Sequence, residues 1–218
     1  MRLLIVCCIA VVGVGCLQRT PRRLDKDAIR ASFLRFKDAV VAADATAAAD
    51  ELSTNVFTYF TSLRDAALTA TPDDLAELPL ARQFQVLRIR DNLTATDLQG
   101  MSGRQLAEQF IAGDWLNTDL VSRLKLGNII HKGDAAEAGY GDEQGMSRDR
   151  LVFRREEQGW KLDLSKTSLL ESSQLEKQMK SRDIDRVAFL TEVISATNPS
   201  RPVADLWRPL LPQAERAE

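Results

Sequence analysis

The apolar residues of this chain change their spacing near residue 120, and this change restricts the fold more than any other feature. Before it they recur every three or four positions, as on one face of an α-helix, and after it they alternate, as on a β-strand. Helices followed by an antiparallel meander have the order of an α+β protein. We therefore predict one α+β domain over residues 26–198, with a helical insert, a C-terminal helical extension and a Pro-containing tail over residues 199–218.

Two apolar stripes in the first half each predict an amphipathic helix, one capped by Asp25 or Asp27 and one that starts near Thr46. Their apolar positions are Ile29, Phe33, Phe36 and Val40 in the first helix, and Leu52, Val56, Phe60, Leu63 and Ala67 in the second. Pro72 suits the first turn of a further helix. Residues 80–93 are compatible with a helix or a strand, and the spacing from Ser102 to Gln105 predicts a capping box for a helix that ends at Gly113.

Beyond residue 120 the alternation predicts a strand over residues 124–131, a turn at Gly133 and a weaker strand over residues 135–140. Residues 141–147 read as a loop. A hairpin turning at residues 156–159 is the clearest β signal, with Trp160 as its core anchor. After residue 165 we expect a polar stretch, then a helix whose apolar residues lie between 184 and 194, and a loosely packed tail from Ser200.

The N-terminus is typical of a secretion signal. Met1 and Arg2 precede an uncharged run over residues 3–15 that ends in small residues. The apolar run over residues 3–17 is shorter than the about 20 residues that a transmembrane helix needs. We therefore predict a removed signal peptide over residues 1–15.

Residues 13–16, Gly-Val-Gly-Cys, resemble the lipobox of bacterial lipoproteins, although that family usually has Leu where this chain has Gly13. The alternative is ordinary cleavage after Gly15. All three cysteines lie at positions 7, 8 and 16, so cleavage would leave Cys16 as a lone thiol in an oxidising compartment. Acylation removes that liability. We therefore expect Cys16 to carry the lipid that attaches the protein to a membrane.

Leu17 stands where lipoproteins retained at the inner membrane often have Asp, which favours the outer membrane if the organism has one. The domain would then face the periplasm or the exterior. Residues 16–25 form the lipidated cysteine and a basic tether with Arg19, Arg22 and Arg23. We interpret these arginines as a solvated spacer, with contact to anionic headgroups as the alternative.

Composition excludes several kinds of chemistry. The net charge of −2 and the lack of a basic patch beyond the tether argue against a nucleic-acid partner. The single histidine, His131, and the cysteine positions cannot build a zinc cluster. No phosphate-binding glycine loop and no Gly-x-Ser-x-Gly elbow occurs. We therefore predict no metal, no cofactor and no catalytic residue, and we interpret His131 as a surface strand residue.

The opening helix over residues 28–43, the short helix after it, and the ending Leu151–Asp163 with its Gly159-Trp160-Lys161-Leu162 sequence resemble the nuclear-transport-factor-two-like family. The resemblance covers residues 26–165 and implies helices wrapped around a bent antiparallel sheet in a cone shape. The insert over residues 70–113 and the helical extension depart from that family's compact plan.

The resemblance implies a pocket that binds an apolar small molecule or an envelope protein. The alternative is a lyase- or isomerase-like enzyme, whose acid–base groups would come from Tyr59, Tyr140, Asp114 and Asp163. We expect Asp163 to face solvent because it alternates with Trp160 and Leu162, and Asp114 to form a helix-end turn. A third interpretation is a docking module that uses an exposed apolar stripe on residues 184–194.

Overall fold

The computed structural model describes residues 21–143, 145–166 and 172–211. The signal peptide, Cys16 and residues 17–20 of the tether therefore lie outside the described residues, and residues 21–25, predicted as tether, belong to the first helix. The helices that precede the sheet are α1 (Pro21–Val41), α2 (Ala45–Asp50), α3 (Thr54–Thr69), α4 (Pro72–Ala76), α5 (Leu80–Asn92), α6 (Ala95–Gln99), α7 (Gly103–Ala112) and α8 (Thr118–Arg123). The sheet and the elements after it are β1 (Lys125–Lys132), β2 (Ala135–Asp142), β3 (Gly145–Glu156), β4 (Gly159–Asp163), η1 (Leu164–Lys166), α9 (Ser172–Arg182), α10 (Arg186–Ser195) and α11 (Val203–Leu206).

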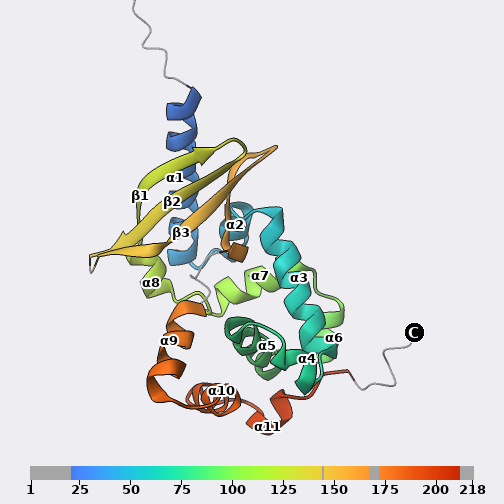
Figure 1. Ribbon diagram of the computed structural model, residues 1–218. Helices are drawn as coiled ribbons and strands as arrows, with labels where there is room; N and C mark the ends of the chain where they lie inside the picture. The colour runs from blue at the N-terminus through green and yellow to red at the C-terminus, as the bar shows by residue number, and fades with distance from the viewer. Residues whose placement is uncertain (1–20, 144, 167–171, 212–218) are drawn as a thin grey trace, which may run out of the picture.

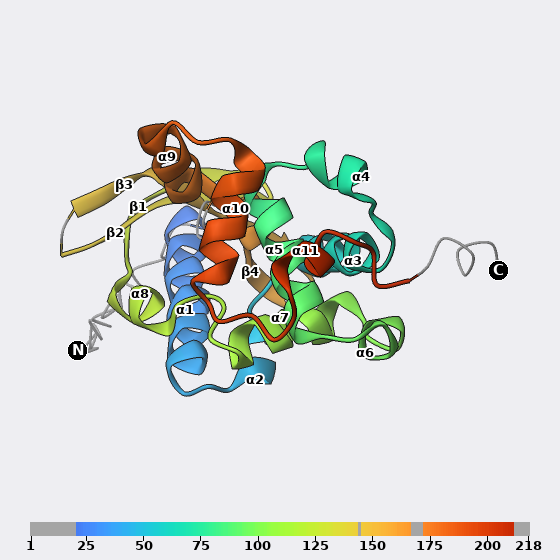
Figure 2. The same ribbon diagram turned by 90° about the horizontal axis from the view of Figure 1, so that it is seen from below.

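The described chain is an α+β protein, as the change of periodicity predicts (Figure 1). The sheet and α1 form one end of the molecule, and α9, α10 and α11 form the other. Helices α3, α5 and α7 lie between them, and Figure 2 shows the same arrangement from below. None of the described helices combines the length and the apolar composition needed to cross a bilayer.

The sheet is an antiparallel meander in the order β1-β2-β3-β4. The predicted hairpin is confirmed, with Phe153 opposite Leu162 and Arg155 opposite Trp160. The segment expected to be a loop over residues 141–147 is mostly strand, because β2 runs to Asp142 and β3 begins at Gly145. A bulge between Leu126 and Ile129 changes which face the later residues of β1 occupy.

Helix α1 buries the whole predicted stripe, from Ile29 to Val40, against the sheet and α2. The predicted cap is wrong, since α1 begins at Pro21 and Asp25 lies within it. The Asp25 carboxylate instead accepts hydrogen bonds from Arg155 and Trp160 of the hairpin. A residue that suits a helix cap is therefore used to attach the first turns of α1 to the sheet.

The predicted second helix is divided into α2 and α3, although its apolar stripe is buried as expected. At the break, Glu51 O accepts from Leu162 N at 2.8 Å and Ser53 N donates to Leu162 O at 3.0 Å. These bonds form a short parallel bridge between Leu52 and Leu162 along the free edge of β4. Covering an edge strand outweighs the helical periodicity at this point.

The predictions for the ends of the later helices are confirmed. Pro72 lies in the first turn of α4, Ser102 with Gln105 forms a capping box, and Gly113 is the C-cap of α7. Thr71 with Asp74 forms a second capping box, which we did not predict. The ambiguous segment is the helix α5, which is largely buried between α3 and the C-terminal helices. Burial on most sides explains why its apolar pattern shows no clear period.

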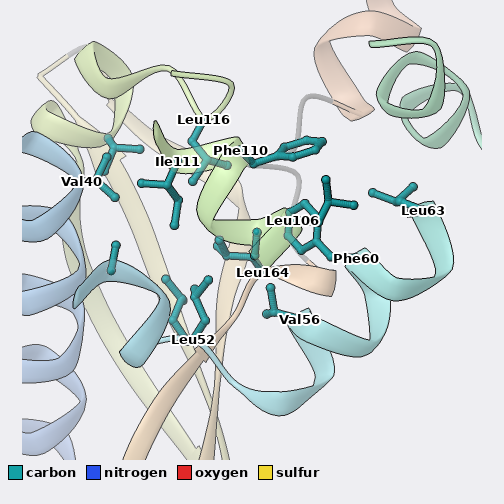
Figure 3. Close-up of a cluster of buried hydrophobic side chains, with 14 of the residues drawn as sticks. Val40, Leu52, Val56, Phe60, Leu63, Leu106, Phe110, Ile111, Leu116 and Leu164 are labelled. Atoms are coloured by element: carbon teal, nitrogen blue, oxygen red, sulfur yellow. The ribbon is translucent and has the colours of Figure 1, made fainter. Parts of the chain in front are cut away.

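The core is continuous from α1 to α7. Figure 3 shows side chains of α3 and α7, together with Val40, Leu52, Leu116 and Leu164, packed around a common centre. Phe60 and Phe110 contact edge to face with ring centroids 4.7 Å apart, and Phe110 meets Trp115 at 4.4 Å. Apolar core side chains therefore lie between the helices and the sheet, as Figure 3 shows.

The C-terminal segment contains two helices, α9 and α10, followed by a docked tail. Leu206 of α11 is buried, and Leu211 N donates to Leu68 O at 2.9 Å. Loose packing of the tail is therefore wrong for its described part. Phe189, Leu190 and Ile194 of α10 are also buried, so the apolar stripe proposed for docking belongs to the core.

Candidate functional site

The candidate site is an open groove between α2, the first turn of α3, α7 and the turn that joins β3 to β4. Its volume is about 510 Å³, which lies within the range of small-ligand sites, roughly 300–1,000 Å³. Ala49 and Leu52 form a buried apolar floor, and Phe57 and Arg104 form one wall. Lys161 and residues 156–158 form the other wall. We call this feature the hairpin groove.

Lys161 is the cation that lies deepest in the hairpin groove. Its residue is 8% exposed, and its Nζ donates to Asp50 O at 2.5 Å. It reaches this position because it lies on the face of β4 opposite Trp160 and Leu162, beside the last residue of α2. An ammonium has three N–H donors, and this carbonyl accepts one of them.

Arg104 is held by groups on three helices, α2, α3 and its own helix α7. Its Nη2 lies 2.7 Å from Asp50 Oδ1, its Nε lies 3.0 Å from Glu108 Oε1, and its guanidinium stacks 5.6 Å from the centre of the Phe57 ring. The hydrogen bond to Asp50 is the main reason why the pKa of Arg104 lies above the ordinary value of an arginine. Arg104 is therefore a rigid wall of the groove, with its charge already matched.

Glu156 closes the N-terminus of α3. The N-cap residue Ser53 makes no side-chain cap, and its buried Oγ has no hydrogen-bond partner. Glu156 Oε1 instead accepts from Thr54 N at 2.9 Å and from Thr54 Oγ1 at 3.0 Å. A carboxylate at this position also complements the positive end of the helix dipole. The hairpin thus supplies the cap that the local sequence lacks.

Asp163 lies beneath the same end of α3 and is fully buried, so the prediction that it faces solvent is wrong. It does alternate with Trp160 and Leu162, but α3 and Arg154 cover the face of the sheet on which it lies. Its carboxylate accepts from Arg154 Nε at 2.7 Å, Asn55 Nδ2 at 3.1 Å and Ser165 Oγ at 2.5 Å. Burial raises the pKa of Asp163, but these hydrogen bonds outweigh it, and the pKa lies below its usual value.

A second polar cluster joins α1 to the sheet around Asp25. Asp25 Oδ1 accepts from Arg155 at 2.5 Å and from Trp160 Nε1 at 3.2 Å. Burial raises the pKa of Asp25, but these two bonds and the charges of Arg155 and His131 lower it more. Trp160 is 4% exposed, which confirms it as the core anchor of the hairpin.

His131 belongs to this second cluster, so its interpretation as a surface residue is wrong. Its side chain is 17% exposed, and its ring meets Trp160 edge to face at 5.3 Å. Nε2 lies 3.1 Å from Asp25 Oδ2 without the alignment of a hydrogen bond. The bulge in β1 places His131 on the inner face of the sheet, where it packs against α1.

The tyrosines and carboxylates considered for acid–base chemistry have other partners. The Tyr59 hydroxyl donates to Gln85 Oε1, and burial raises the pKa of Tyr59 despite the nearby charge of Arg82. Tyr140 is buried on β2. Asp114 forms the helix-end turn that we predicted, with φ of 54° and a hydrogen bond from Thr118 N at 2.6 Å. The contacts of Asp163 and Tyr59 therefore do not indicate an acid–base pair.

The part of the chain that the structure describes contains no group of three or more His, Cys, Asp or Glu side chains able to hold a metal ion. Cys16, the predicted lipid attachment site, lies outside the described residues. The hairpin groove could not be found from the sequence, because Glu156 belongs to the predicted turn and Lys161 alternates with the apolar Trp160 and Leu162. Lys161 is buried because the end of α2, distant in sequence, lies beside it.

No protein-family model, no curated protein and no solved structure matches this chain.

Proposed function

We propose that the chain is a lipid-anchored protein of the cell envelope that binds a protein partner through the hairpin groove. The observation that carries the binding part is the groove itself, which combines a buried apolar floor with walls of both charge signs. Protein partners present apolar and charged groups together, and specificity arises from their arrangement. A purely apolar ligand would offer no acceptor to the buried ammonium of Lys161, so the groove suits it less well.

The position of the groove supports a partner at the membrane. Four residues separate Cys16 from the start of α1 at Pro21. Fully extended, this spacer places the two ends at most about 18 Å apart. Residue 155, which directly precedes the turn of the groove, binds Asp25 in the first turns of α1. A lipid on Cys16 would therefore hold the groove near the bilayer, within reach of other envelope proteins.

The anchor is tested by replacing Cys16 with Ser in the full chain and following acyl-chain incorporation and membrane fractionation. We expect the wild type to carry label and to fractionate with membranes, and the variant to do neither. An unlabelled wild type that fractionates like the Ser variant would overturn the anchor.

The groove is tested by photo-crosslinking in the native host, with a photoreactive residue in place of Gln158 on the groove turn. The matched control replaces Val187, which is 55% exposed on α10 at the far end of the molecule. We expect one protein to crosslink at position 158 but not at position 187, and to be lost in the Cys16→Ser background. The same pattern at both positions, or no product at position 158, would contradict a partner site in the groove.

A further inference from the structure

Lys161 is unusual among the buried charges of this protein. The buried carboxylate of Asp163 is surrounded by donors, and the buried guanidinium of Arg90 by acceptors. Among the residues that the structure describes, Lys161 has a single neutral carbonyl as its hydrogen-bond partner, Asp50 O, although its residue is only 8% exposed. A buried ammonium is costly unless its donors are matched, so the geometry around Nζ favours an additional acceptor supplied from the groove.

In the hairpin groove a positive charge lies deep and negative charges lie at the exposed rim. Lys161 is buried near the floor, whereas the side chain of Asp50 is 62% exposed and Glu157 is exposed on the turn. Glu156 and Arg104 are already engaged with Thr54 and with Asp50 and Glu108. A deep cation beneath an acidic rim matches a ligand that carries a negative group at its tip and a positive group farther back.

The apolar surfaces define what lies between those two charges. Leu52 is 3% exposed and Ala49 is fully buried, so the floor offers no polar group from their side chains. Phe57 presents its ring beside Arg104 on the neighbouring wall. An aliphatic side chain that lies next to the negative tip would cover this floor and exclude water from the contact with Lys161.

We infer that the hairpin groove binds the carboxyl terminus of a polypeptide. The terminal carboxylate accepts a hydrogen bond from Lys161 Nζ, an aliphatic last side chain packs on Leu52 and Phe57, and a basic residue just upstream pairs with Asp50 and Glu157 on the rim. This inference rests on the proposed function, since it names the part of the partner that enters the groove.

Two other anionic ligands fit this arrangement less well. Asp50, Glu156 and Glu157 outnumber Arg104 and Lys161 in the groove by one charge. A phosphate group would bring up to two negative charges to this acidic rim, and a fatty acid would bring one without compensation. A chain terminus with a basic neighbour adds no net charge. The acidic rim attracts its basic residue, whereas it repels a phosphate group or a fatty acid.

The first test is calorimetric titration of the full chain, purified in detergent, with the peptide acetyl-Lys-Ala-Leu as free acid and as C-terminal amide. We expect the free acid to bind and the amide to have an affinity at least about tenfold lower, because a hydrogen bond between charged groups is lost. Equal binding of the two peptides, or no binding of the free acid, would overturn the inference. Free leucine that binds as tightly as the peptide would also overturn it, since the ligand would then be an amino acid.

The second test compares Lys161→Met with Lys180→Met, a matched change at an exposed position on α9. Circular dichroism first establishes that each variant is folded. We expect Lys161→Met to abolish the preference for the free acid and Lys180→Met to retain it. A folded Lys161→Met protein that still prefers the free acid contradicts the inference. If neither peptide binds but a specific crosslink forms at position 158, the proposed function stands and only the inference that the groove binds a carboxyl terminus is rejected.

Discussion

The two ends of α3 are closed in different ways. At its C-terminal end, the guanidinium of Arg90 is fully buried and donates to Ala66 O, Ala67 O and Ala70 O at 2.6–2.9 Å. It also donates to Leu206 O at 3.0 Å, which attaches α11 to the same site. At its N-terminal end, Glu156 binds the backbone of Thr54 at the edge of an open groove.

Both ends obey the same electrostatics, because a cation meets the free carbonyls and an anion meets the free N–H groups of the helix. They differ in how completely the charges are matched. The guanidinium of Arg90 donates to four backbone carbonyls, whereas the ammonium of Lys161, near the other end, donates to one carbonyl within the described part of the chain. The comparison suggests that the C-terminal end of α3 serves stability and the N-terminal end serves binding.

The largest effect is expected at the closed end. Arg90→Met removes a charged donor from the carbonyls of residues 66, 67 and 70, of which the first two keep one backbone donor each, and it removes the link to α11. We expect it to lower the free energy of unfolding by about 3–5 kcal/mol. Denaturant unfolding measures this loss. Arg208→Met is the control, since its side chain is 78% exposed and its partner among the described residues is the exposed Asp205, and we expect a change of less than about 0.5 kcal/mol. A similar loss in both variants would remove the distinction.

Asp163→Asn tests the buried carboxylate that supports the open end. The charge-assisted bonds from Arg154 and Asn55 weaken, and we expect a loss of about 1.5–3 kcal/mol at neutral pH. Because the folded-state pKa of Asp163 is lowered, its contribution is complete above the unfolded pKa of about 3.9 and is lost as the pH falls through the folded-state value. The difference between wild type and variant should therefore shrink below about pH 4 in unfolding titrations. A pH-independent difference would contradict this assignment.

Glu156→Gln tests the cap of α3 with a smaller expected effect. The amide oxygen can still accept from Thr54 N, but the charge that complements the helix dipole is lost. We expect a loss of about 0.5–1 kcal/mol that decreases with added salt. Glu157→Gln, one residue farther along the turn, has no role in the cap and should change the unfolding free energy by less than about 0.5 kcal/mol.

Lys161→Met is expected to have the smallest effect on stability. The methionine keeps most of the apolar stem, removes a buried charge and leaves Asp50 O at a residue that water can reach. We expect the unfolding free energy to change by no more than about 1 kcal/mol in either direction. A loss as large as that of Arg90→Met would show that Lys161 is structural, and the contrast between the two ends of α3 would disappear.

The sequence predicted the elements well where the signal was local. Apolar stripes, the capping box at Ser102 and the hairpin depend on residues within a few positions of one another, and these predictions are confirmed. The prediction failed between α2 and α3, where Leu162, more than a hundred residues away in sequence, pairs with the backbone on both sides of Leu52. No local sequence pattern could predict those hydrogen bonds.

The candidate site depended on tertiary structure to a greater degree. Period-2 alternation assigned Lys161 and Asp163 to the face opposite Trp160, and that assignment is correct. It could not tell that α3 packs against β4 beside Asp163 or that the end of α2 lies beside Lys161. His131 shows the same limit, because one bulge in β1 turned it toward α1.

The sequence by itself therefore determined the order of helices and strands, the faces of most elements and the residues that end them. It also carries the N-terminal pattern from which we expect an anchor at Cys16. The tertiary structure decided which polar residues are buried and which of them face a groove. The physical reason is that periodicity is a property of neighbours along the chain, whereas the burial of a polar side chain depends on whichever distant element covers it.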